Sequence, residues 1–153
     1  MNQENIKFKL EFESRYWDQP PGITVLVGQQ QCYHGLAWCQ QLVVEFYCVL
    51  DFDQDYTLMI KRWNKTDDQC QTVDNVIKDQ MLILRKVEID RIDVQNVVLS
   101  ASWFEPQYSV TYQPDHALET QVLGETWFGH NGTWRLQFRS PTWQWLIKDI
   151  WGG

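Results

Sequence analysis

Apolar and polar residues alternate with a period of two along most of this chain, most densely over 81–99 (MLILRKVEIDRIDVQNVVL). Val87 and Ile89 fall on one face there, with charged residues on the other. After Asp90 the parity reverses, so that the next apolar residue is Ile92. Because a shift of one residue turns every side chain to the opposite face, one regular strand cannot bury both halves. We therefore predict a kinked strand, or two short strands, crossing the middle of a sheet.

The same alternation marks other strands. Residues 6–12 alternate in the way typical of an antiparallel strand with one face in the core. Residues 41–50 and 56–63 are separated by a tip rich in aspartate, which predicts a β-hairpin. Two shorter strands are expected at 23–27 and 133–139, the latter with Trp134, Leu136 and Phe138 facing inward.

Three stretches lack a sustained period. Residues 29–41 are mixed in character and too short for a helix, so we expect a loop there, and 64–74 predicts a polar loop. Residues 100–125 contain two prolines and several aromatic residues, which favours a long surface excursion. His130-Asn131-Gly132 predicts a tight turn.

The C-terminus changes to a helical period. Ser140 suits an N-cap, and Pro141 suits the first helical position. The apolar residues that follow at helical spacing are Trp143, Ile147, Ile150 and Trp151. A short amphipathic helix should therefore close one end of the fold, and it depends on docking because two or three turns are marginal alone.

Together these elements predict an all-β fold, an antiparallel β-sandwich of jelly-roll or carbohydrate-binding-module type with a short C-terminal helix. The 153 residues fit one domain, 1–153, which can bury roughly 68–70% of its unfolded surface. Hydrophobic residues make up 44% of the chain, and the nine tryptophans are the unusual feature. Tryptophan serves both cores and binding platforms, so this excess has to be divided between the two uses.

The net charge of −7 and the lack of any Lys/Arg block argue against binding of nucleic acid through its phosphates. No apolar run approaches the length of a membrane span, and the first residues alternate rather than forming a signal peptide. We expect synthesis and folding in the cytoplasm, with no membrane insertion. The four cysteines are then expected to be reduced, with Cys48 in the core.

Four segments in order carry a resemblance to a known group of proteins. They are Leu58-Met59-Ile60 with Asn64-Lys65-Thr66-Asp67, then Val87-Glu88-Ile89-Asp90-Arg91-Ile92-Asp93-Val94, then Asn131-Gly132-Thr133-Trp134, and Ser140-Pro141-Thr142-Trp143-Gln144-Trp145-Leu146. The pattern resembles uncharacterised small β-sandwich proteins of large tailed phages of marine cyanobacteria, which are similar to carbohydrate-binding-module folds. The resemblance implies a virion protein, such as a tail or capsid accessory part, made in the host cytoplasm.

Aromatic residues gather in and beside the 100–125 excursion. Sugar rings expose apolar C–H faces that stack on such rings, while nearby amides and carboxylates bind the hydroxyls. The candidate ligand- or partner-binding residues are Trp103, Phe104, Tyr108, Tyr112, Trp127 and Phe128, with Glu105, Gln107 and Asp115 nearby. The alternative is that these rings anchor the loop to the sheet or pack against a neighbouring subunit.

Two sets of potential metal ligands are present. Asp67, Asp68, Asp74 and Asp79 could supply the oxygens of a calcium site, although their spacing matches no EF-hand and solvated loop acids explain it as well. Cys32, His34 and Cys39 could bind zinc, but the spacing is not that of a finger and a fourth ligand is missing. We therefore expect no metal and no cofactor.

An enzyme is not expected from this sequence. Glu105 and Glu125 could act as a glycosidase pair only if their carboxyl groups lay about 5–9 Å apart. GxSxG, HExxH and phosphate-cradling motifs are missing.

Two functions remain open. The first is a non-enzymatic virion structural protein that acts in assembly or adhesion through aromatic-rich loop surfaces, with other phage structural proteins as partners in a homo- or hetero-oligomer. The alternative is a carbohydrate-binding module that recognises glycans of the host surface.

Overall fold

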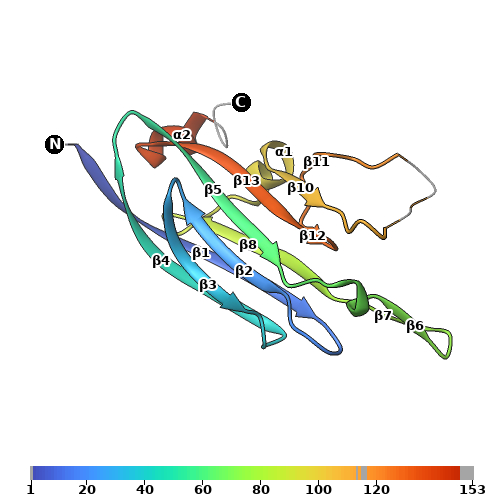
Figure 1. Cartoon of the computed structure of the whole chain (residues 1–153). Coiled ribbons are helices and arrows are strands. Elements are labelled where there is room, and N and C mark those ends of the chain that lie inside the picture. Colours follow the sequence, from blue (N-terminus) through green and yellow to red (C-terminus); the bar gives the residue numbers. More distant parts are fainter. Residues whose placement is uncertain (1, 113, 115–116, 149–153) are drawn as a thin grey trace.

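Two antiparallel sheets pack face to face in the computed structural model of this chain, which describes residues 2–112, 114 and 117–148 (Figure 1). The first sheet has the order β12-β8-β1-β4, with β9 paired to β8. Its strands are β1 (Gln3–Arg15), β4 (Gln41–Asp51), β8 (Met81–Ile89), β9 (Ile92–Asp93) and β12 (Trp127–Phe128). The predicted antiparallel β-sandwich is therefore confirmed.

The second sheet has the order β11-β10-β13-β5-β2-β3. Its strands are β2 (Gly22–Val27), β3 (Gln30–Leu36), β5 (Gln54–Trp63), β10 (Trp103–Gln107), β11 (Val122–Leu123) and β13 (Asn131–Ser140). Strands β4 and β3 are thus edge strands of the two sheets, and only four residues, 37–40, join them.

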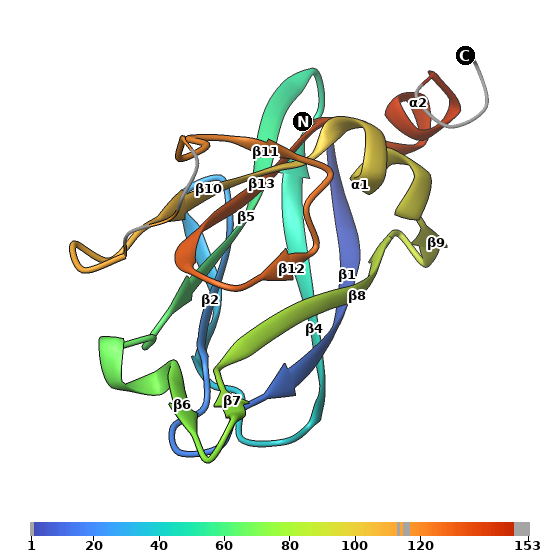
Figure 2. The same ribbon diagram turned by 90° about the vertical axis from the view of Figure 1, so that its right-hand side faces the viewer.

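Short secondary-structure elements lie at the two ends of the sandwich. A small hairpin of β6 (Gln71–Val73) and β7 (Val76–Lys78) follows the 3-10 turn η1 (Asp67–Gln69) at one end. Helix α2 (Thr142–Leu146) lies at the opposite end, near the N-terminus, and α1 (Gln95–Ala101) follows β9 (Figure 2).

The core consists of the inward-facing residues of both sheets, as the alternation predicts. In β1 every second side chain from Ile6 to Phe12 is buried, and in β13 Trp134, Leu136 and Phe138 are buried. Burial of such side chains contributes about 25 cal/mol per Å² of apolar surface, which makes this interior the main source of stability.

The predicted hairpin of residues 41–50 and 56–63 is wrong, although both strands exist. Strand β4 pairs with β1, whereas β5 pairs with β2 and β13, so the connection between them crosses from one sheet to the other. Each strand buries every second side chain over most of its length. That pattern tells which face is buried but not which sheet the strand joins.

The parity reversal in 81–99 is confirmed as a tight turn, but the second half is only partly strand. Asp90 and Arg91 have positive φ angles of 54° and 66°, which closes β8 onto β9. The residues after β9 form α1, whose buried residues Val97 and Val98 lie at helical spacing from the buried N-cap residue Val94. Residues 94–99 therefore correct the prediction of a strand.

Three further expectations are corrected. Residues 30–36 form β3 rather than a loop, and residues 103–107 form β10 within the second sheet rather than a surface excursion. In α2 the buried apolar residue is Leu146, whereas Trp143 and Ile147 are exposed. The Ser140 hydroxyl donates to Glu4 instead of capping the helix, while Ile150 and Trp151 lie outside the described residues.

Candidate functional site

The pairing of β10 with β13 creates the most developed surface site. Gln107 pairs with Asn131 at the end of this ladder, so the residues just beyond it, Tyr108 and His130, become neighbours. Close approach requires Gly132 at this point, because a Cβ atom there would lie 2.4 Å from the carbonyl oxygen of Glu105. Strand register, rather than sequence proximity, thus assembles the site.

Three rings form one wall of this site. The rings of Tyr108 and Tyr112 stack with centroids 5.5 Å apart, and the His130 ring meets each of them edge-on at 4.8 Å. Burial lowers the pKa of His130, and the positive charges of Lys65 and Arg62 lower it further. His130 is therefore neutral at pH 7 and packs as an aromatic residue.

Polar groups face this wall across an open cleft of about 790 Å³. The Ser109 hydroxyl donates to Asp67, and the Lys65 ammonium lies 2.7 Å from a carboxylate oxygen of Asp79. We call this site the tyrosine cleft, and its lining includes Lys65, Asp67, Tyr108, Ser109, Tyr112 and His130. It combines apolar ring surface with a positively charged lysine, negatively charged aspartates and a hydroxyl group, all of which can form hydrogen bonds.

A buried arginine supports Asn131, which lines the tyrosine cleft. Arg62 on β5 is 1% exposed and donates three hydrogen bonds, to Phe128 O (3.2 Å), Gln80 O (2.8 Å) and Asn131 Oδ1 (3.0 Å). Asn131 in turn exchanges two hydrogen bonds of 2.9 Å with the backbone of Lys65. The Asn131 side chain therefore joins the loops that carry Lys65 and His130, and the Arg62 guanidinium holds Asn131 in place.

Tyr108 and Tyr112 are the two predicted binding residues that line this cleft. Phe104 and Phe128 stack on each other with centroids 4.7 Å apart, and they are 3% and 0% exposed. Both belong to the core, so the expectation that they form an accessible binding surface is corrected.

The two predicted tryptophans lie elsewhere. Trp103 donates from Nε1 to a carboxylate oxygen of Glu105 at 3.0 Å. Trp127 is 45% exposed, and the guanidinium groups of Arg15 and Arg85 lie 5.1 and 5.3 Å from its ring centroid. Neither residue lines the tyrosine cleft, so the structure divides the predicted aromatic set among four locations.

The proposed calcium ligands do not converge. Asp67 accepts from Ser109, Asp68 accepts from Thr66, and Asp79 pairs with Lys65. Asp74 is exposed at the tip of the β6–β7 hairpin. Among residues 2–112, 114 and 117–148, no group of three or more His, Cys, Asp or Glu side chains could hold a metal ion.

The proposed zinc ligands are also separated. The His34 ring stacks on Trp63 with centroids 4.9 Å apart, and its Nδ1 lies 2.7 Å from the Thr24 hydroxyl. Cys39 is exposed, whereas Cys32 packs against the core. These three side chains point to different surroundings.

The two glutamates considered as a catalytic pair have separate roles. Hydrogen bonds from Trp103 and Arg135 lower the pKa of Glu105, which keeps it ionised. Glu125 accepts a hydrogen bond of 2.9 Å from the backbone N–H of Trp127. A glycosidase acid requires a raised pKa, and Glu105 has the opposite shift.

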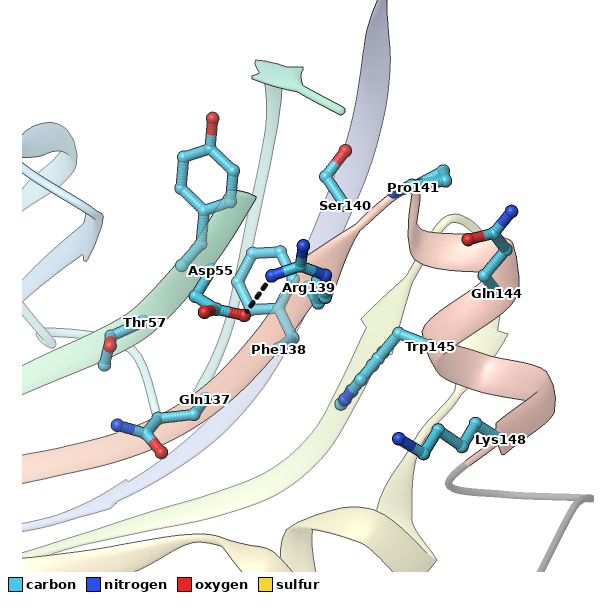
Figure 3. A pocket seen from close by; sticks show the side chains of 11 residues that line it. Asp55, Thr57, Gln137, Phe138, Arg139, Ser140, Pro141, Gln144, Trp145 and Lys148 are labelled. Carbon is cyan, nitrogen blue, oxygen red and sulfur yellow. Dashed lines mark hydrogen bonds and ion pairs between the residues drawn. The ribbon is translucent and has the colours of Figure 1, made fainter. Parts of the chain in front are cut away.

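A second cleft of about 620 Å³ lies between α2 and strands β5 and β13. Trp145 and Lys148 extend from the C-terminal helical segment toward Gln137 and Phe138 of β13, beside the ion pair of Arg139 with Asp55 at 2.9 Å (Figure 3). The Trp145 ring is tilted against Phe138 with centroids 5.9 Å apart, so it docks α2 on the sheet. We assign this cleft mainly to packing of the helix.

Sequence reasoning missed Lys65, Ser109 and His130 as members of the site. His130 was expected only as part of a tight turn, because nothing in the linear pattern relates it to tyrosines some twenty residues earlier. The β10–β13 register brings them together.

No protein-family model, curated protein or solved structure matches this chain. Within the part of the chain that the structure describes, no helix is long and apolar enough to cross a membrane.

Proposed function

We propose that this chain is a non-enzymatic phage virion protein that acts in adhesion, and that the tyrosine cleft binds carbohydrate. The observation that carries the proposal is the stacked pair Tyr108–Tyr112 facing Asp67, Ser109 and Lys65 across an open cleft. The virion context comes from the resemblance in the sequence.

The chemistry of the cleft suits a sugar. Tyr112 is 40% exposed, so part of its ring is open to the apolar C–H face of a pyranose. The hydroxyl groups of Ser109 and Thr111, 2.9 Å apart, and the Lys65–Asp79 pair supply donors and acceptors for sugar hydroxyls. The buried Arg62 network limits movement of the walls, which reduces the entropy lost on binding.

The acids in the cleft support binding rather than catalysis. Asp79 is neutralised by Lys65, and Asp67 accepts from Ser109. Glycoside hydrolysis needs one protonated and one ionised carboxyl group flanking the bond.

A glycan array followed by calorimetry tests this function. The variant is Tyr112→Ala, which removes exposed ring surface from the cleft. The matched control is Trp143→Ala, because Trp143 is 55% exposed and lies on α2, away from the cleft. We expect glycan binding to fall at least tenfold in Tyr112→Ala and to be unchanged in Trp143→Ala, with both melting temperatures near that of the wild type. If Tyr112→Ala binds the glycan as well as the wild type does, the tyrosine cleft is not the binding site.

A second candidate function is assembly through β4. This edge strand of 11 residues pairs with β1 on one side only within the described chain, and its outward face carries Val43, Tyr47 and Val49 at 49%, 55% and 59% exposure. Glu45, between them, is neutralised by Lys7 at 3.3 Å. Unpaired strand edges with apolar side chains pair readily with another strand, and a second copy of β4 satisfies two-fold symmetry.

Sedimentation of the purified chain tests the second candidate. Assembly predicts a dimer that the double variant Val43→Lys/Val49→Lys converts to a folded monomer, because charges on an edge oppose pairing. A wild-type chain that remains monomeric at high concentration counts against self-assembly through β4, and it leaves the glycan test unaffected.

A further inference from the structure

Two cysteines connect the open edges of the two sheets. Cys32 belongs to β3, the edge strand of one sheet, and Cys48 belongs to β4, the edge strand of the other. Their sulfur atoms lie 3.5 Å apart. Cys48 is 2% exposed and points into the core, whereas Cys32 is partly exposed.

A β-bulge places Cys32 in this position. In the pairing of β2 with β3, Val25 is opposite Tyr33 and Leu26 is opposite Gln31, so Cys32 is the extra residue. Strict alternation would put Cys32 on the same outer face as His34. Because a bulge re-aims the side chain of the extra residue, both Cys32 and Tyr33 pack against the core.

We propose that Cys32 and Cys48 form an inter-sheet disulfide when the folded chain meets a small-molecule disulfide such as oxidised glutathione. A disulfide bond is about 2.05 Å long, so the two sulfurs have to approach by about 1.5 Å from their contact distance of 3.5 Å. Side-chain rotation supplies movements of this size, and the strands already hold the two residues face to face. This proposal is independent of the function proposed above.

The exchange proceeds in two balanced steps. The Cys32 thiolate attacks one sulfur of oxidised glutathione, which forms a mixed disulfide at Cys32 and releases one glutathione thiolate. Cys48 then loses its proton and attacks the Cys32 sulfur, and the bond to glutathione breaks as the second glutathione thiolate leaves. Two protein thiols are oxidised, one glutathione disulfide is reduced to two thiols, and the two protons pass to the released thiolates.

Accessibility fixes the order of these steps. Burial and, after it, the contact with Cys32 together raise the pKa of Cys48 to about 12, so Cys48 stays protonated, and it is covered from solvent. Cys32 is the thiol that an oxidant reaches first. The hidden thiol then resolves the mixed disulfide, because the attacking and leaving sulfurs already lie in contact.

The bond would link the two sheets at their edge strands β3 and β4, which are the outermost strands on this side among the described residues. Fifteen residues, 33–47, separate the two cysteines, and closing a loop of this length restricts the unfolded chain. For a domain of this size, oxidation should raise the melting temperature by roughly 6–12 °C.

Peptide mapping after oxidation tests the proposal directly. The protein is purified under reductant, treated with oxidised glutathione and digested without reduction. Because Cys39 and Cys70 are exposed thiols, the reference protein is the double variant Cys39→Ser/Cys70→Ser, which leaves only the proposed pair. We expect a Cys32–Cys48 linked peptide, an intact mass lower by about two hydrogens as the exchange requires, and the higher melting temperature.

The further variant Cys32→Ser is the matched control. It keeps the buried Cys48, and oxidised glutathione should neither link nor modify that residue nor raise the melting temperature. The proposal is overturned if the reference protein keeps both thiols free, or if Cys32 remains joined to glutathione without resolution. If the disulfide forms but the melting temperature does not change, the inference that it stabilises the fold by linking the two edge strands is wrong.

Discussion

Replacing Arg62 by methionine tests how far one buried guanidinium organises the base of the tyrosine cleft. Its three hydrogen bonds involve a charged donor, and such bonds contribute roughly 1.5–3 kcal/mol each. The carbonyl oxygens of Phe128 and Gln80 would lose this donor, whereas Asn131 would keep its bond from the Lys65 N–H. The gross loss is therefore roughly 4.5–9 kcal/mol.

An opposing effect reduces this loss. Burial lowers the pKa of Arg62 from 12.5 to about 10 despite the nearby charge of Asp79. At about 1.36 kcal/mol per pKa unit, the folded protein spends on the order of 3 kcal/mol to keep the charge buried. Methionine removes that cost, so we expect Arg62→Met to lower the free energy of unfolding by roughly 1.5–6 kcal/mol, with a central value of about 4 kcal/mol.

Urea unfolding followed by tryptophan fluorescence measures this difference. The control is Arg135→Met on the neighbouring strand β13, where Arg135 is partly exposed and pairs with Glu105 at 2.9 Å. A partly exposed ion pair contributes at most about 1 kcal/mol, so the control should change little. If Arg62→Met is as stable as the wild type, or no less stable than Arg135→Met, the Arg62 network does not have the role assigned to it.

Three further predictions concern the same fold. The pKa of His130 is lowered in the folded state, so the unfolded chain binds more protons than the folded chain once the pH falls below the ordinary histidine pKa of 6.5. The free energy of unfolding should therefore decrease as the pH falls from 6.5 toward the folded pKa. In thermal unfolding scans, His130→Gln should lose this part of the pH dependence. Arg91→Gly should raise the free energy of unfolding by about 1 kcal/mol in urea titrations, because glycine adopts the positive φ of 66° more readily than arginine. An unchanged or lower free energy of unfolding would count against strain at this turn. Gly132→Ala should lower the free energy of unfolding by about 1–3 kcal/mol in the same titrations, because its Cβ would meet the Glu105 carbonyl oxygen and disturb the β10–β13 register. The same change should weaken ligand binding in the cleft. Wild-type stability would show that the two strands move apart freely.

The alternation of apolar and polar residues was sufficient to predict the class of fold. A strand buried on one face must present an apolar side chain at every second position, and β1 does so from Ile6 to Phe12 and β13 from Trp134 to Phe138. The reversal at Asp90 likewise predicted the end of β8, because no regular strand can bury both parities. Local rules of this kind depend only on neighbours in the chain.

Pairing between distant segments followed no such local rule. The pattern of β4 and β5 is the same whether they form a hairpin or lie in opposite sheets, and the competing pairing of β4 with β1 decided between them. Residues 94–99 combined β-branched residues with a helical spacing, and packing of α1 on β8 selected the helix. Intrinsic strand preference is weak enough for tertiary contacts to override it.

The candidate site shows the same division. The sequence indicated Tyr108 and Tyr112, because aromatic residues stand out in an irregular segment. It could not assign Phe104 to the core, because the burial of Phe104 depends on Phe128 of the opposing strand β12. His130 and Lys65 joined the tyrosines only through strand register and the Arg62 network. The period of a side chain along the backbone is a local property that the sequence contains, whereas which surfaces meet is settled by the packing of the whole chain.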